Sequence, residues 1–362
     1  MGGGRDRAFT GLILLTFVAI RDRAPPTAVV LGPVQQAKLL QARDDIASRS
    51  AERLNTAIAT LQTPRAQVPA DPDVREALAE GYLLSREFGS LPDALAMGNA
   101  RREAMAALRW GPRSATALRV LGVVAYWWDR DPAAAGRLFH RAIDAALNDA
   151  LVRQCYANIL ADNGEHAAAI REFDAARRLA PGATYLIADY AWGLWSAGRE
   201  EEARALLNDL VRQEPMLASA HDCLSVIAFA ADDLPGYAHY LHLRAKSRAA
   251  PELAAYSGMI KQEVVCGDRA AVYRAMFSRA LSQAKATSQS DHSWAAFIAS
   301  SFGDRTQLID VLRRSQQRSE RWGASGYKRR IGKRWSADET IQQLLASLNQ
   351  SRIEPPPSDS TI

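Results

Sequence analysis

Small and large apolar residues recur at a fixed spacing between Ala150 and Pro215. Two successive segments each carry a glycine, a small residue, two further apolar residues and a proline, in the same order and 34 residues apart. These positions are Gly164, Ala169, Phe173, Ala176 and Pro181, followed by Gly198, Ala203, Leu207, Leu210 and Pro215. Antiparallel helices approach closely only where a side chain is small, which predicts helix crossings at the two alanines. The glycines are expected to end the first helix of each pair, and the prolines to follow the second.

A 34-residue period with this pattern is typical of the tetratricopeptide repeat (TPR), a helix–turn–helix unit, and the two segments resemble TPR proteins. The small residues continue in both directions at steps of 34 or 35, at Ala100, Ala135, Ala169, Ala203 and Ala238. A second series follows seven positions later, at Ala107, Ala142, Ala176, Leu210 and Ala245. Each 35-residue step predicts one extra residue in a turn, within 127–132 and 231–235. The predicted fold is all-α, a TPR-like α-solenoid of antiparallel helix pairs preceded by a short hydrophobic N-terminal helix.

A narrower resemblance covers about Glu52 to Ala250. It rests on the run from Leu78 to Leu84, on the following Phe88-Gly89 turn, and on the Trp-Trp-Asp-x-Asp turn that begins at Trp127. This part is similar to the TPR region of membrane-anchored winged-helix transcription activators and of some bacterial adenylate cyclases. Those relatives carry a DNA-binding or cyclase domain before the repeats, and this chain carries neither. The resemblance therefore implies an architecture of anchor, linker and TPR sensory or interaction region.

The chain divides into five expected parts. They are a hydrophobic segment at 1–23, a linker with a first helix at 24–50, the TPR array at 51–250, degenerate helical repeats at 251–316, and a basic segment with a short helix and a disordered tail at 317–362. The expected tail ends in a proline-rich, polar run, a composition that cannot bury a core.

The N-terminal segment has three possible interpretations. Ala8 to Ile20 is apolar and is bracketed by Arg5-Asp6-Arg7 and Arg21-Asp22-Arg23. As a helix it rises only ~20 Å, against ~30 Å of bilayer hydrocarbon, although flanking arginines can snorkel and the bilayer can thin. A membrane anchor is favoured over a signal peptide, because no small-x-small cleavage site follows. A buried helix that caps the array is the third alternative.

Positive charge is concentrated near the C-terminus. Nine Lys or Arg residues and one acid, Glu320, lie between Arg313 and Arg334, a net charge of +8 in a chain whose total is +5. Trp322 and Tyr327 are interleaved among these charges, which suits anionic lipid or nucleic acid. No nucleic-acid-binding module surrounds the segment, so nucleic acid is an unlikely partner. A solvated tail is the preferred interpretation, with contact to anionic lipid as the functional alternative.

No catalytic or cofactor-binding motif is found. The sequence contains no phosphate-binding glycine loop, no H-E-x-x-H and no G-x-S-x-G, and its three cysteines are far apart. His239 and His242 lie one helical turn apart, near Asp232 and Asp233. We interpret them as polar helix positions and not as metal ligands. The predicted protein is not an enzyme and holds no cofactor or metal.

The concave face of the array is the candidate binding site. In TPR arrays, the first helix of each pair lines an inner groove through fixed positions of the unit. Ten residues take these positions: Arg119, Tyr126, Trp127, Gln154, Asn158, Asp162, Trp192, Trp195, Asp222 and Phe229. Aromatic groups mixed with hydrogen-bonding groups suit the capture of a peptide. Trp192 and Trp195 have a second interpretation, as core between repeats.

The sequence thus predicts a non-catalytic protein-interaction or sensory scaffold built on TPRs. A protein or peptide is expected in the groove, and Ala8 to Ile20 is expected to tether the chain to the bacterial inner membrane. The alternative is the TPR sensory part of a membrane-anchored transcription regulator whose DNA-binding domain is missing.

Overall fold

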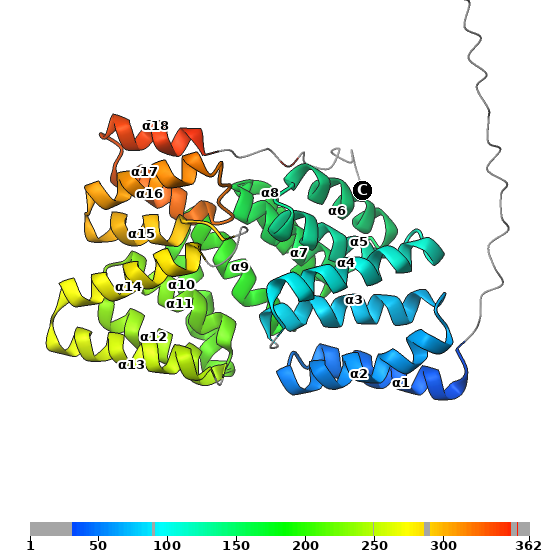
Figure 1. Cartoon of the computed structure of the whole chain (residues 1–362). Coiled ribbons are helices and arrows are strands. Elements are labelled where there is room, and N and C mark those ends of the chain that lie inside the picture. The colour runs from blue at the N-terminus through cyan, green and yellow to red at the C-terminus, as the bar shows by residue number, and fades with distance from the viewer. Residues whose placement is uncertain (1–30, 89–90, 249, 286–289, 349–352, 354–362) are drawn as a thin grey trace, which may run out of the picture.

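The computed structural model describes residues 31–88, 91–248, 250–285, 290–348 and 353 (Figure 1). Within these residues the chain forms eighteen α-helices and one π-helical turn, and no strand. The helices are α1 (Pro33–Ala47), α2 (Ala51–Gln67), α3 (Pro72–Glu87), α4 (Asp93–Trp110), α5 (Ala115–Val123), α6 (Pro132–Ala145), α7 (Ala150–Asn163), α8 (His166–Leu179), α9 (Thr184–Ala197), α10 (Glu200–Gln213), α11 (Ala218–Ala230), α12 (Leu234–Ser247), α13 (Pro251–Cys266), α14 (Arg269–Ala284), α15 (Ser293–Phe302), α16 (Arg305–Gln317), α17 (Ser325–Arg334) and α18 (Glu339–Ser347). The predicted all-α fold is confirmed. The expected N-terminal helix over Ala8 to Ile20 lies outside the described residues.

Consecutive helices from α1 to α16 pack in pairs, and each second helix from α2 to α14 also packs against the first helix of the next pair. Every small residue of the predicted series is buried at these contacts, with Ala169 and Ala203 both 0% exposed. Phe173 and Leu207, four residues further on, are also fully buried. One hydrophobic core runs through the array from α3 to α18. The period in the sequence is therefore the period of the packing.

Glycine ends the first helix of each central pair. Gly164 and Gly198 have φ angles of 91° and 87°, a left-handed conformation that costs glycine little. The next backbone N–H then returns to the helix: that of Arg199 donates to the Leu194 carbonyl at 2.8 Å. The predicted helix ends are confirmed. Gly267 and Gly303 end α13 and α15 in the same way, which extends the pattern beyond the central repeats.

The first 35-residue step is accommodated inside a helix and not in a turn. After α5, residues Val124–Trp128 form a π-helical turn, in which the Asp129 N–H donates to the Val124 carbonyl at 3.0 Å. Such a bulge takes up one inserted residue without breaking the helix. At the second step the Asp233 N–H donates to the Ala228 carbonyl. The Arg199 N–H donates to the Leu194 carbonyl in the same way, 34 residues earlier. That turn contains no extra residue, and the prediction of an insertion there is wrong.

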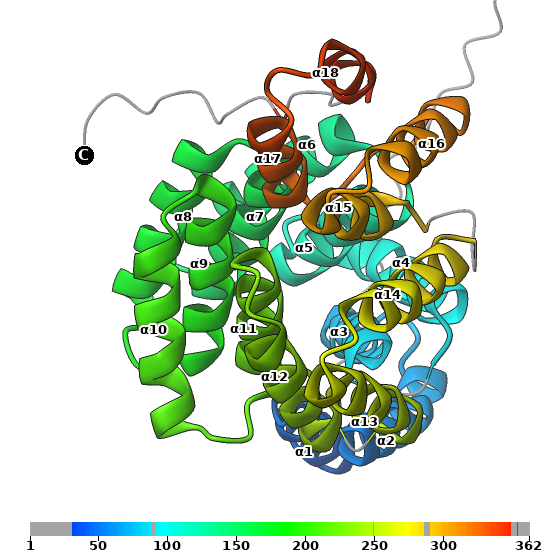
Figure 2. The same ribbon diagram turned by 90° about the vertical axis from the view of Figure 1, so that its left-hand side faces the viewer.

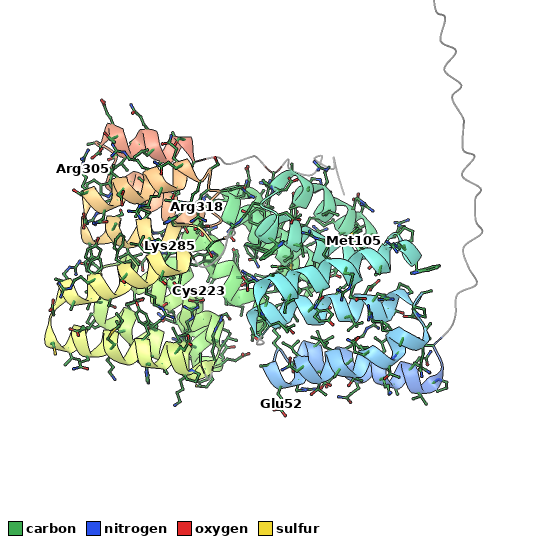
Figure 3. All side chains as sticks on the ribbon, in the orientation of Figure 1. Glu52, Met105, Cys223, Lys285, Arg305 and Arg318 are labelled. Atoms are coloured by element: carbon green, nitrogen blue, oxygen red, sulfur yellow. The ribbon has the colours of Figure 1, made fainter. Side chains whose placement is uncertain are left out.

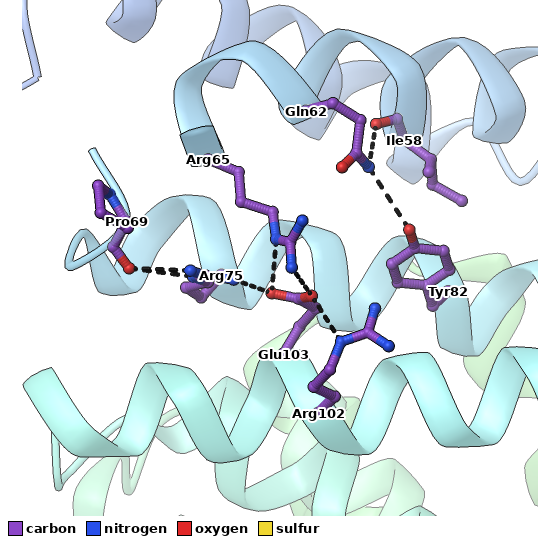
Figure 4. Close-up of polar contacts among 8 residues, drawn as sticks. All are labelled: Ile58, Gln62, Arg65, Pro69, Arg75, Tyr82, Arg102 and Glu103. Atoms are coloured by element: carbon purple, nitrogen blue, oxygen red, sulfur yellow. Dashed lines mark hydrogen bonds and ion pairs between the residues drawn. The ribbon is translucent and has the colours of Figure 1, made fainter. Parts of the chain in front are cut away.

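The N-terminal pair has a small core of its own, shared by α1, α2 and one face of α3. A buried carboxylate links this N-terminal pair to the rest of the array (Figure 4). The Glu103 side chain, 1% exposed, accepts from Arg65 on α2 at 3.1 Å and from Arg75 on α3 at 2.5 Å. A buried charge is tolerated only when it is paired in this way. One acid of α4 thus joins three successive helices.

The array curves so strongly that its C-terminal helices return to its middle (Figures 1 and 2). Helix α17 packs against α7 and α9 as well as against its neighbour α15. The prediction that the basic segment is a solvated tail is therefore wrong, because its second half is this docked helix. Arg305 and Arg318, labelled in Figure 3, lie at the two ends of α16. The predicted short helix near the end of the chain is α18.

Candidate functional site

The inner face of the array is lined by the first helices of the pairs, and all ten residues predicted for the groove are on these helices or in the π-helical turn that extends α5. Five of them are buried: Arg119, Tyr126, Gln154, Trp195 and Phe229. The other five are half-buried: Trp127, Asn158, Asp162, Trp192 and Asp222. Whether these residues contact a partner stays a prediction, but the structure shows what each of them holds within the chain.

Asp162 is the acceptor for two indole groups from neighbouring first helices. Its carboxylate accepts from Trp127 Nε1 at 3.2 Å and from Trp192 Nε1 at 3.3 Å. Burial raises the pKa of Asp162 to about 7, and the two indole hydrogen bonds oppose this shift by favouring the anion. The side chain therefore fixes two tryptophans of the inner face and changes charge near neutral pH.

Asn158 and Gln154 are engaged by an acid that the sequence analysis missed. Their amides donate to one carboxylate oxygen of Asp189 on α9, at 2.7 and 2.5 Å. Burial raises the pKa of Asp189, against these two hydrogen bonds. Asp189 is the only charged residue of α9, which is otherwise largely apolar. A lone acid on such a helix could have been identified from the sequence as a candidate for a buried polar contact. The amides and the acid tie α7 to α9.

The aromatic residues of the groove are covered by the chain's own C-terminal helices. Trp195 is fully buried, stacked on Trp192 at 4.8 Å between ring centroids and contacted at its edge by Tyr327 of α17. Phe229 is met by Trp294 and Phe297 of α15, at 5.4 and 5.7 Å. The sequence left two interpretations open for Trp195, a groove residue or core between repeats, and the structure shows Trp195 in the core.

Arginines of the basic segment stack on the same surface. The Arg330 guanidinium lies 3.5 Å from the centre of the Trp195 ring, and that of Arg321 lies 4.4 Å from the centre of Tyr126. A guanidinium over an aromatic face is attracted by the ring's negative charge density. Gly326 permits this approach, because a Cβ atom there would lie 2.6 Å from Trp195.

The basic segment also meets the carbonyl ends of the first helices. Arg330 donates to the Trp195 carbonyl at 3.0 Å, and Ser325 Oγ donates to the Ala161 carbonyl at 2.6 Å. Arg321 donates to Asn163 Oδ1, at the last residue of α7, at 2.8 Å. The C-terminus of a helix carries partial negative charge and unpaired carbonyls, so it favours cations. This accounts for a strongly basic helix docking at the ends of α7 and α9.

The part of the inner face that the C-terminal helices leave uncovered is a hollow of about 420 Å³. We call it the open groove. Its walls come from α1, α3, α5, α7, α9 and the turn after α1, through Arg43, Ile46, Ala47, Arg49, Glu76, Ala77, Glu80, Leu84, Thr116, Leu151 and Tyr185. Leu151 and Tyr185 also line a wider hollow beside the loop between α6 and α7, so that the surface continues. None of the open groove's residues was among the ten predicted.

Two further predicted residues are held by ion pairs. Arg119, 3% exposed, donates to Glu80 in the wall of the open groove at 3.0 Å. Asp222 pairs with Arg244 at 2.8 Å.

His242, considered above as a possible metal ligand, lies with its Nδ1 3.5 Å from Ser257 Oγ. In the described part of the chain, no cluster of three or more His, Cys, Asp or Glu is placed to hold a metal ion.

Comparison with known proteins identifies the repeat. Residues 160–225, the stretch with the clearest period, match the family model of the tetratricopeptide repeat. The chain contains tetratricopeptide repeats. No enzyme family is indicated, and no curated protein matches the chain.

Solved structures similar to this TPR chain include PilF of Pseudomonas aeruginosa, at 14% identity and a TM-score of 0.40, covering 76% of this chain and 96% of PilF. Yeast Tom70 is 14% identical with a TM-score of 0.47, covering 85% of this chain and 64% of Tom70. PilW, a type IV pilus biogenesis factor, is 13% identical with a TM-score of 0.32, covering 87% of this chain and all of PilW. The family match, and not these distant likenesses, carries the identification.

Proposed function

We propose that this TPR protein is a non-catalytic interaction or sensory scaffold whose inner face holds a peptide or helix of a protein partner. The observation that carries the proposal is the division of that face. Its middle is filled by α15 and α17, whereas the open groove beside it presents residues from five helices and one turn, with mixed apolar and charged walls. A hollow of this size with a few polar groups suits a segment of another protein.

Photo-crosslinking tests where the partner lies. A crosslinking amino acid at Thr116 or Leu151, in the open groove, is expected to capture a partner in cells of the native host. The same amino acid at Met105 on α4 or Leu179 on α8, both exposed on second helices, serves as the matched control. Equal capture from the control positions would place the partner on the outer face and overturn the proposal.

The scaffold is further proposed to be tethered to the bacterial inner membrane by Ala8 to Ile20. The support is the apolar composition of that segment, which lies outside the described residues. Among the described helices, none has the length and hydropathy needed to cross a bilayer. The full chain is expected to sediment with membranes and to resist high salt, and a chain lacking residues 1–23 to stay in the supernatant. Release by salt alone would instead indicate electrostatic attachment, which salt screens.

A further inference from the structure

Arg49 presents an unpaired guanidinium to the open groove. It lies in the turn after α1, with its guanidinium carbon 4.8 Å from the Tyr185 ring centre and 5.6 Å from that of Phe88. These rings come from α9 and from the end of α3, so the contact with Tyr185 spans the groove. Within the described residues, no hydrogen bond or ion pair engages the five N–H donors of Arg49. Contacts with two aromatic rings restrict the guanidinium, and its N–H groups stay available for an acceptor.

The acids of the open groove already have partners. Glu80 accepts from the buried Arg119 at 3.0 Å. Burial raises the pKa of Asp189 on α9, and its two amide hydrogen bonds and the positive charge of Arg49 oppose this shift. Glu76 is half-buried, and burial raises the pKa of its carboxyl despite a hydrogen bond from Ser114. Among the charged side chains that line the open groove, Arg49 is thus the one that no hydrogen bond or ion pair engages within the described residues.

Arg43 is a second cation of the groove wall. It pairs with Asp73 at 2.8 Å, but both side chains are about half exposed, at 46% and 58%. Exposed pairs of this kind contribute ~0–1 kcal/mol, so Arg43 can change partner at little cost. Two cations of the groove wall are thus able to receive an anion.

Most of the other lining residues are apolar. Ile46, Ala77, Leu84 and Leu151 come from α1, α3 and α7 and line the same hollow as the charged groups. A hollow of about 420 Å³ accommodates a few side chains, and it shares Leu151 and Tyr185 with the hollow beside the loop between α6 and α7. The open groove therefore places a guanidinium that can bind a carboxylate beside an aliphatic surface.

We propose that the open groove binds an acidic peptide segment of the partner, with an Asp or Glu side chain received by Arg49 and a neighbouring aliphatic side chain packed against Ile46, Leu84 and Leu151. This inference rests on the proposed function, because it specifies the partner of the same face. An arginine fork and a carboxylate form two parallel charge-assisted hydrogen bonds, which gives the contact both strength and orientation.

The test measures binding of the full chain to an array of synthetic decapeptides with acetylated and amidated ends. The expected result is selection of peptides in which Asp or Glu adjoins Leu, Ile or Val. Replacing the acid with Asn or Gln is expected to weaken binding about 10- to 100-fold, the range for a hydrogen bond to a charged group.

Variants of one residue locate the contact. Arg49→Gln is expected to lose the preference for acids, and Arg49→Lys to recover only part of it, because an ammonium lacks the planar fork. Arg49→Glu is expected to select Lys-containing peptides instead. Arg178→Gln, at an exposed position of α8, removes the same charge away from the groove and is the matched control. Thermal melts verify that each variant is folded.

Three results would overturn the inference. Acid selection that survives in Arg49→Gln would assign it to another site. Binding only to a parallel set of peptides with free C-terminal carboxylates would mean that the groove recognises the end of a chain and not an acidic side chain. Competition by inorganic phosphate as strong as that by the acidic peptides would likewise reduce the site to a general anion site. If crosslinking from the open groove succeeds while acids are not selected, this inference fails and the proposed function stands. If crosslinking fails as well, both fail.

Discussion

Replacing Trp195 with Ala tests whether the basic helix is held by the inner face. The side chain is fully buried, with Trp192 stacked on one side and Arg330 3.5 Å from its ring centre. Truncating a buried tryptophan costs ~3–5 kcal/mol, and the lost aromatic and cation–π contacts argue for the upper part of this range. The indole N–H has no hydrogen-bond partner among the described residues, so no hydrogen bond is lost with it. We expect a loss of about 4 kcal/mol.

Urea denaturation followed by circular dichroism measures the loss, and brief trypsin digestion without urea shows where it acts. The segment from Arg313 to Arg334 carries nine trypsin sites, which docking protects. Cleavage there is expected to accelerate in Trp195→Ala before the rest of the array is cut. Trp110→Ala, at a position 43% exposed, is the control and is expected to cost about 1 kcal/mol or less. An unchanged denaturation midpoint together with unchanged cleavage would refute the docking described for α17.

Three further substitutions test other parts of the structure. Ala169→Glu places a carboxylate at a fully buried crossing and is expected to cost at least ~1–3 kcal/mol in a thermal melt, whereas Ala167→Glu on the exposed side of α8 is expected to be nearly neutral. Burial opposes the ionisation of Glu320, but hydrogen bonds from the side chain and backbone of His292 hold its pKa below the ordinary value. Its ionised form therefore stabilises the fold above about pH 4.3 and loses this effect as the pH falls, so Glu320→Gln is expected to flatten the acid limb of the stability curve. For Asp162 the sign is reversed: its pKa is about 7 in the folded chain and about 3.9 unfolded, so wild-type stability falls as the pH rises between these values, and Asp162→Asn is expected to remove that slope. A curve parallel to the wild type in either variant would contradict the assignment.

Periodic features of the fold were predictable because they are local. A helix pair needs a small residue at its crossing and a left-handed residue at its turn, and these requirements repeat with every unit. Ala169, Ala203, Gly164 and Gly198 therefore identified both the repeat and its boundaries from the sequence. The same reasoning failed at the first 35-residue step, since an extra residue can be absorbed in a helix as a π-helical turn as readily as in a loop.

The site was predictable only in part. The positions that face inward follow from the unit, and the ten predicted residues do lie on the first helices and on the π-helical turn that continues α5. Their roles depend on partners that the period does not specify. Asn158 and Gln154 turn to Asp189 on the next first helix, and Asp162 joins two indoles. Each of these contacts is set by the rotation between neighbouring repeats.

The sequence by itself determined the repeat, the helix ends and the residues that pack between helices, because each depends on contacts within one unit or between adjacent units. Only the tertiary structure decided which part of the inner face is filled and which is open. Small rotations accumulate over many repeats until α17 meets Trp195, from which Arg330 is 135 residues distant, and Arg49 meets Tyr185 across the groove. That curvature turns a predicted basic tail into part of the core and leaves the Arg49 guanidinium, unpaired within the described residues, facing the open groove.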